Sequence, residues 1–145
     1  MHTPIATGPA IVAAVAEALN GRPPAIVAPA GSPVPSSWQP DGPPLDDDIA
    51  VLIGTSGSTG APKGVLLARD AITASVTATH RRLGGAGNWV CPLPLHYVAG
   101  MMTVARAHLG GGRLSVVASD LTELPLHPGR NYLSLVAAQL HRALD

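Results

Sequence analysis

A ten-residue stretch, 55–64, combines side chains and backbone features that suit a polyphosphate ligand. Two glycines, Gly57 and Gly60, let the chain turn tightly and bring backbone N–H groups close to an anion. Four hydroxyl groups that can donate to phosphate oxygens come from Thr55, Ser56, Ser58 and Thr59. Lys63 adds a compact positive charge on a flexible stem. Residues 55–64 are therefore predicted to form a phosphate-binding loop.

Lys63 is the only lysine among nine basic residues, and its place inside this stretch is unlike a chance arrangement. A flexible Gly/Ser linker is the plain alternative. It is disfavoured because apolar segments enclose the stretch on both sides. The Walker motif GxxxxGK[ST] is absent, since Pro62 precedes Lys63, and no GxGxxG follows a predicted strand.

A second charged residue stands out because the segment around it is otherwise uncharged. Arg106 lies on a predicted helix, and a half-buried arginine prefers a carboxylate, which it can bind through two parallel hydrogen bonds. The alternative is an arginine on the helix surface. The remaining titratable groups are less informative. His80, His108, His127 and His141 lack the spacing of a metal site, and Cys91 resembles a small buried apolar residue.

The elements that must position these residues alternate between strand and helix. Helical spacing of apolar residues and helix-stop signals predict helices over residues 9–20, 70–83, 98–109 and 137–144. Apolar runs bounded by turn residues predict strands over 25–28, 49–53, 64–68, 89–91, 114–118 and 132–136. Residues 29–44 are proline-rich and are predicted to be an extended surface loop. The alternation predicts an α/β fold with a mainly parallel sheet and flanking helices.

Composition excludes several classes of protein. The chain has 145 residues, 46% of them apolar and 12% charged, which excludes a disordered protein. Nine basic and nine acidic residues cancel, so neither nucleic acid nor a membrane is expected as a partner. A single cysteine allows no intrachain disulfide and favours a cytoplasmic location.

At this point a family resemblance becomes specific. The segment TSGSTGAPKG, residues 55–64, resembles the phosphate-binding loop of the adenylate-forming superfamily, in its acyl-CoA synthetase branch. The preceding DDDIAVLIG is similar to the family's approach strand, although Gly54 stands where many members have an aromatic residue. The resemblance implies that Thr55 to Gly60 bind the phosphates of ATP. It implies that Lys63 neutralises negative charge during adenylation.

The segment PLHYVAG, residues 94–100, resembles the family's second signature, which lines the pocket for the carboxylate substrate. His96 and Gly100 are therefore expected to bind substrate, although a histidine among apolar residues is more often structural. PLHYVAGMMTVAR and YLSLVAAQLHRAL both look like the 2-succinylbenzoate–CoA ligase subfamily of menaquinone biosynthesis. The second segment departs from the usual Val-Pro-Thr-Gln-Leu at Ala137 and Ala138. That resemblance implies that Arg106 meets a second carboxylate of the substrate.

The resemblance also implies the co-substrates and what is absent. It implies ATP, Mg²⁺ with most of its ligands outside this chain, and CoA, with a small carboxylate as substrate. Homo-oligomers remain possible. Residues 1–145 are expected to be a partial N-terminal adenylate-forming domain, without its later portion and without a C-terminal domain, and to be inactive alone. The alternatives are another acyl- or aryl-CoA ligase, an adenylation domain that loads a carrier protein, and a non-catalytic nucleotide-binding or assembly fragment.

Overall fold

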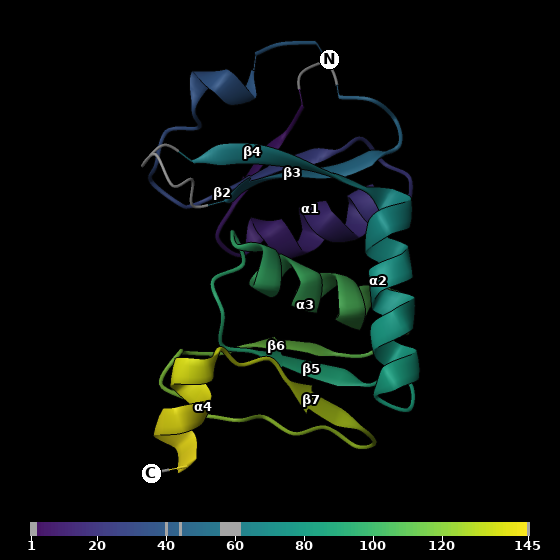
Figure 1. The fold of residues 1–145 in the computed structure, drawn as a ribbon, viewed down its shortest axis with the longest axis vertical. Coiled ribbons are helices and arrows are strands. Elements are labelled where there is room, and N and C mark those ends of the chain that lie inside the picture. The colour runs from purple at the N-terminus through teal and green to yellow at the C-terminus, as the bar shows by residue number, and fades with distance from the viewer. Residues whose placement is uncertain (1–2, 40, 44, 56–61, 145) are drawn as a thin grey trace.

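The chain folds as two β-sheets with a pair of helices between them. The computed structural model describes residues 3–39, 41–43, 45–55 and 62–144. Figure 1 shows sheet A, made of β1 to β4, at one end and sheet B, made of β5 to β7, at the other, with α1 and α3 stacked between. Helix α2 runs along one side of the stack, and α4 lies beside sheet B near the C-terminus.

Sheet A has the strand order β1-β2-β3-β4. Its strands are β1 (Ile5–Thr7), β2 (Ala25–Ala28), β3 (Ile49–Thr55) and β4 (Lys63–Ala68). The first three strands are parallel, whereas β4 is antiparallel to β3 and pairs Lys63 with Thr55 at the end of the ladder. β2 is buried along its whole length, which explains its unbroken apolar sequence AIVA.

Sheet B has the order β6-β5-β7, and both pairings are parallel. Its strands are β5 (Asn88–Cys91), β6 (Leu114–Val116) and β7 (Asn131–Leu133). Asn88 joins the amino ends of the three strands, because its side chain bonds Arg113 N at 3.0 Å and Pro128 O at 3.2 Å. These hydrogen bonds fix where β6 and β7 begin relative to β5.

At the carboxyl ends of the strands of sheet B, one buried side-chain amide joins the segments that follow them. Gln139, 4% exposed, donates to Pro92 O and Ser119 O, both at 3.3 Å, and accepts from Val136 N at 3.1 Å. These three groups belong to the segments that follow β5, β6 and β7. A buried side-chain amide in this position satisfies backbone groups that would otherwise lose hydrogen bonds on folding.

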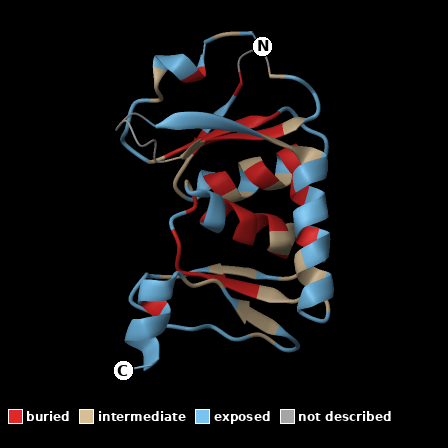
Figure 2. Ribbon diagram, in the orientation of Figure 1, coloured by how far each residue is buried: buried red, intermediate tan, exposed pale blue. Residues whose placement is uncertain are grey.

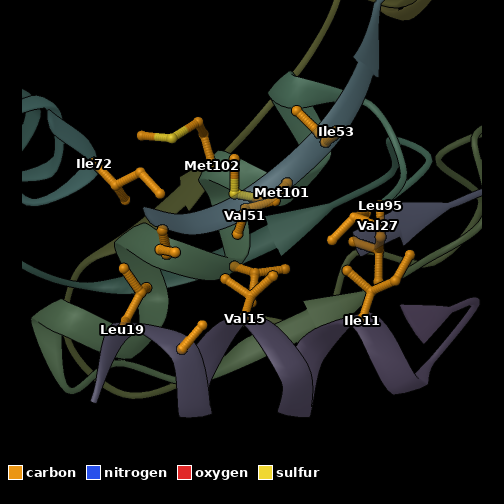
Figure 3. Close-up of a cluster of buried hydrophobic side chains, with 14 of the residues drawn as sticks. Ile11, Val15, Leu19, Val27, Val51, Ile53, Ile72, Leu95, Met101 and Met102 are labelled. Atoms are coloured by element: carbon orange, nitrogen blue, oxygen red, sulfur yellow. The ribbon is translucent and has the colours of Figure 1, made fainter. Parts of the chain in front are cut away.

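The helices are α1 (Ala10–Leu19), α2 (Arg69–Arg82), α3 (Val98–Gly110) and α4 (Ala137–Leu144). Figure 2 shows that buried residues concentrate in sheet A, α1, α3 and β5, while α2 and α4 are largely exposed. In Figure 3, Val15 of α1 points toward Val51 of β3 and Met101 of α3, and Ile11 points toward Val27 and Leu95. These side chains are buried, so the central helix pair carries the main apolar core.

The expected α/β class is confirmed, with five differences in detail. The strands divide between two sheets, and the β3–β4 pairing is antiparallel. β1 was not predicted, because three residues are too few for a periodic pattern. The proline-rich loop contains a 3-10 helix, η1 (Ser36–Trp38), so it is not wholly irregular. The predicted helix at 70–83 begins one residue earlier, at Arg69.

Candidate functional site

A cavity of about 540 Å³ lies at the carboxyl ends of the parallel strands β2 and β3. We call it the strand-end cavity. Its lining comes from β2, the proline-rich loop, β3, the residue before β4 and the segment before α3: Val27, Ala28, Pro29, Ser32, Pro33, Pro35, Trp38, Gly54, Thr55, Pro62, His96 and Tyr97. Ligands of open α/β sheets bind outside the carboxyl ends of the strands, so the location is that of a ligand site. Its volume lies within the roughly 300–1,000 Å³ typical of small-molecule pockets.

The predicted phosphate loop meets this cavity at both of its ends. Thr55 is the last residue of β3 and Pro62 directly precedes β4, and both line the cavity. Residues 56–60, predicted to bind phosphate, lie outside the described residues. Lys63 pairs with Thr55 across the β3–β4 ladder, and the Thr55 hydroxyl donates to Lys63 O at 3.4 Å. Lys63 is exposed, which leaves its ammonium group free to reach an anion.

The second sequence motif contributes His96 to the same cavity. His96 is half-buried, and its ring centroid lies 4.4 Å from that of Tyr97. His96 lies 32 positions after Gly64, the last residue of the first motif. The two motifs nevertheless come close in space, because α3, which follows His96, packs against β3, which ends at Thr55. The structure thus unites Thr55 and His96, two of the predicted site residues, around one space.

Gly100 packs against the backbone of Pro94 and Leu95, just before His96. A Cβ atom at Gly100 would lie only 2.2 Å from Pro94 O and 2.8 Å from Pro94 C. Only glycine lets the first turn of α3 approach the 92–96 segment so closely. The structure gives Gly100 a packing role beside the site, and its direct contact with substrate stays a prediction.

His96 also lines a second cavity, of about 460 Å³. This apolar cavity is lined by the start of α1, the 92–95 segment and the residues after β6: Gly8, Pro9, Ile11, Val12, Pro92, Leu93, Pro94, Leu95, Val116, Val117 and Ser119. The imidazole is the one ionisable group in its described lining. His96 therefore lines both cavities. The strand-end cavity contains residues of the predicted phosphate loop, and the apolar cavity contains none of its described residues.

Arg106 is placed away from the strand-end cavity. Its guanidinium carbon lies 5.3 Å from the centre of the Trp89 ring, a cation–π geometry. Burial lowers the pKa of Arg106, and its Nε is buried without a hydrogen-bond partner. Two nearby nitrogens, His80 Nε2 and Trp89 Nε1, are also buried without a hydrogen-bond partner among the described residues. The structure does not bring Arg106 together with His96, and its role in binding a carboxylate stays a prediction.

Trp38 and Tyr97 line the cavity but were not predicted as site residues. Trp38 is one of two tryptophans in the chain and lies within a proline-rich loop, which is the one signal that could have identified it. An aromatic residue buried beneath a loop stabilises that loop. Sequence spacing alone could not show which strand the ring contacts.

The described residues offer neither a metal centre nor a membrane span. No group of three or more His, Cys, Asp or Glu side chains in the described part of the chain could hold a metal ion. Within the same residues, no helix combines the length and the apolar character needed to cross a membrane.

Parallel strands with a cavity at their carboxyl ends, next to the antiparallel β3–β4 pair, define the class as an α/β protein with a candidate small-molecule site. Comparison with known proteins makes the assignment narrower. The chain belongs to the family of AMP-binding enzymes, whose model matches residues 8–130.

Individual relatives are similar over different shares of the chain. A Mycobacterium tuberculosis protein named "Probable 2-succinylbenzoate–CoA ligase" is 40% identical over an alignment 160 positions long, gaps included, which covers 99% of this chain and 40% of the relative. The 2-succinylbenzoate–CoA ligase of Lactococcus lactis is 32% identical, with 79% of this chain and 26% of the relative covered. The chain thus spans about two fifths or less of the length of these relatives.

A solved structure confirms the fold. A double mutant of o-succinylbenzoate CoA synthetase from Bacillus subtilis, bound with a product analogue, superposes with a TM-score of 0.56. Its sequence is 19% identical, and the match covers 79% of this chain and 33% of that one. The likeness supports the arrangement of strands and helices described above.

Proposed function

We propose that the natural protein is an ATP-dependent acid–CoA ligase, with a 2-succinylbenzoate-type dicarboxylate as substrate. In the first step a substrate carboxylate attacks the α-phosphorus of ATP, forming acyl-AMP and releasing pyrophosphate. In the second step the CoA thiol attacks the acyl carbon and releases AMP. The observation that carries the proposal is 40% identity, along nearly the whole chain, to the Mycobacterium tuberculosis protein with that name.

The phosphate-loop residues would bind the ATP phosphates during the first step. Backbone N–H groups and hydroxyls of Thr55 to Gly60 would donate to phosphate oxygens, and Lys63 would balance the charge that develops on pyrophosphate. Two observations support this role. Thr55 and Pro62 line the strand-end cavity, and Lys63 lies opposite Thr55 in the hairpin.

The substrate carboxylate would approach from the His96 side of the strand-end cavity. His96 would orient one carboxylate toward the phosphates, because it lines both cavities. Arg106 would bind a second carboxylate through its guanidinium. The unpartnered Nε and the absence of any other charge in residues 98–110 apart from His108 support that role.

ATP takes part in such reactions as its magnesium complex, and Mg²⁺ would screen the phosphate charge. The described residues supply no carboxylate cluster for the ion. We therefore assign its protein ligands to no residue of this chain. We further propose that residues 1–145 form part of an N-terminal adenylate-forming domain and that the protein is cytoplasmic.

Substrate-dependent exchange between ATP and labelled pyrophosphate tests the first step. It should be measured on the natural gene product and, separately, on residues 1–145. We expect exchange with 2-succinylbenzoate in the natural product and none from residues 1–145 alone. Acyl-AMP formed by residues 1–145 alone would contradict the domain assignment, and the absence of exchange with every carboxylate tested would contradict the ligase assignment.

Lys63→Ala should reduce the exchange rate by about 10²–10³-fold, as for loss of one preorganised charge-stabilising group. Lys63→Arg keeps the charge and serves as the matched variant. Unchanged exchange in Lys63→Ala would show that the loop has another role. CoA and a phosphopantetheinyl carrier protein, offered as competing acceptors, separate a CoA ligase from a carrier-loading adenylation domain.

A further inference from the structure

The indole of Trp38 lies across a pair of glycines at the base of the phosphate-loop hairpin. Gly54 of β3 and Gly64 of β4 are direct partners in the antiparallel ladder. Trp38 Cη2 lies 2.8 Å from the position that a Cβ on Gly54 would occupy, and Trp38 Cδ1 lies 3.0 Å from that of Gly64. One end of the ring system therefore covers each glycine.

Both glycines are required by this close approach. A Cβ atom at Gly54 would be nearer to the indole than real Cβ atoms come, and one at Gly64 would be closer than in most real contacts, so a larger residue at either position would require the buried ring to shift. Neither glycine has the positive φ that marks a tight turn. Room for Trp38 is thus the feature of the structure that explains glycine at these two positions.

A hydrogen bond attaches the same side chain to the end of the loop. Trp38 Nε1 donates to Pro62 O at 3.2 Å. Pro62 lies just beyond the last ladder pair, Thr55 with Lys63, and its carbonyl accepts this hydrogen bond from the indole. The indole consequently contacts the strand that enters the loop and the segment that leaves it.

Trp38 is itself held firmly. It is 6% exposed and forms a separate apolar cluster with Ile26 and Leu52 on the face of sheet A away from α1. Val34 and Leu45 pack against the edge of that cluster. Its backbone N–H bonds Pro35 O at 2.9 Å within η1. Because these contacts restrain the ring, the ring in turn restrains the β3–β4 residues that it touches.

We propose that Trp38 is a positioning residue that clamps both ends of the 56–61 segment and so sets the spacing of Thr55 and Lys63 at the strand-end cavity. The inference rests on the proposed function, in which that pair faces ATP phosphates. It adds a residue from the proline-rich loop, 16 positions before Gly54 in the sequence, to the machinery that holds the nucleotide. Trp38 acts through Gly54, Gly64 and Pro62 and needs no contact with the ligand.

Backbone amide hydrogen exchange on residues 1–145 tests the clamp without any ligand. In Trp38→Leu, amides of residues 53–55 and 63–65 should exchange about tenfold faster or more, because the end of the ladder opens locally. Amides of residues 49–51 and of sheet B should keep their rates. Trp38→Phe retains a ring over the glycines and should give an intermediate increase.

Trp89→Leu is the matched control. Trp89 is 4% exposed against 6% for Trp38, but it lies in β5 and contacts Tyr132 and Arg106. It should accelerate exchange in sheet B and leave residues 53–55 and 63–65 unchanged. If both tryptophan variants accelerate the same amides, or if Trp38→Leu accelerates none at the hairpin, the clamp is refuted.

Gly54→Ala supplies a coupling test. Alone, it should displace the indole and accelerate the hairpin amides as Trp38→Leu does. Added to Trp38→Leu, it should have no further effect, because the clashing ring is gone. Additive increases would overturn the proposed contact as the cause.

Inorganic pyrophosphate, titrated calorimetrically into the same variants, separates the clamp from the proposed function. Trp38→Leu should weaken binding about tenfold, since misplaced groups lose their geometry, and Trp89→Leu should change it less than about twofold. Equal weakening by both variants would overturn the positioning role. If the wild-type chain does not bind pyrophosphate, the phosphate role of residues 55–63 fails, and the exchange pattern alone then confirms or refutes the clamp.

Discussion

Sheet A and sheet B are stabilised by different interactions. In sheet A, β2 and the middle of β3 are buried on both faces, and their side chains pack against α1 and α3 or against Trp38. In sheet B, β6 and β7 are only half-buried. Asn88 and Gln139 join its strands at opposite ends through hydrogen bonds to backbone groups.

The difference shows how each half presents its part of the candidate site. Apolar packing is strong but non-directional, so it makes sheet A a rigid platform. In our proposal, the ring of Trp38 then sets the alignment of β3 with β4 at the cavity. Hydrogen bonds are directional, so sheet B aligns the segments after its strands even though its apolar area is small. His96 follows one of those segments, and Thr55 ends a strand of the platform.

The largest expected effect tests the apolar half. Ile53 is fully buried in β3. Ile53→Ala should lower the free energy of unfolding by about 2–5 kcal/mol, as for other large-to-small changes in a core. Urea denaturation followed by circular dichroism measures it, and Ile5→Ala, at a side chain that is 50% exposed, is the control. Equal losses in the two variants would show that burial in β3 is not the source of stability.

A smaller effect is expected in the polar half. Gln139→Ala leaves two carbonyls without this donor, that of the buried Pro92 and that of Ser119, whose hydrogen bond is part-buried. The free energy of unfolding should fall by about 1–3 kcal/mol. Asn88→Ala should cost less, because its hydrogen bonds are exposed and water replaces them. The same denaturation experiment compares the two variants, and a greater loss for Asn88→Ala would reverse this ranking.

The pH dependence of stability tests the junction between the halves, where Cys91 ends β5. Burial raises the pKa of the Cys91 thiol above its ordinary value of 9.0. The folded state therefore holds the proton more tightly, and this contribution is present below pH 9.0 and lost as pH rises through the raised pKa. Unfolding measured from about pH 7.5 to 10.5 should show a steeper alkaline loss in the wild type than in Cys91→Ala. Parallel curves would show that the thiol does not contribute.

The smallest change in stability is expected at Arg106. Arg106 has no ion-pair partner among the residues that the structure describes, and replacing such a half-buried cation with an apolar side chain of similar length is often neutral or stabilising. Arg106→Met should change the free energy of unfolding by less than about 1 kcal/mol. In the natural gene product, the same variant should raise KM for a dicarboxylate far more than for its monoester. Equal effects on both substrates would contradict a second-carboxylate site.

Local patterns predicted the elements well. The run Ile49–Ile53 identified β3, and the sequence of residues 137–144 identified α4 with the bounds that the structure has. Both depend on side-chain periodicity within a few residues, which sequence records directly. The glycine-rich stretch and His96 were also located by sequence, since their chemistry resides in the residue types.

Contacts between distant segments could not be predicted in the same way. Trp38 and Gly64 are 26 positions apart, and Gln139 and Pro92 are 47 apart. Which surfaces meet depends on how two sheets stack on a helix pair, and no single segment encodes that arrangement. The division into sheets A and B belongs to the same category, because strand propensity does not specify a partner strand.

The pairing of Thr55 with Lys63 has a consequence for insertions and deletions. Side chains alternate between the faces of a strand, so a shift of β4 by one residue against β3 would send Lys63 to the opposite face from Thr55. It would also remove glycine from the place beneath Trp38. A change in length within residues 56–61 leaves the pairing of the two strands intact, whereas a single deletion inside β4 reverses it. The hairpin can therefore accept variation in loop length far more readily than variation in strand length.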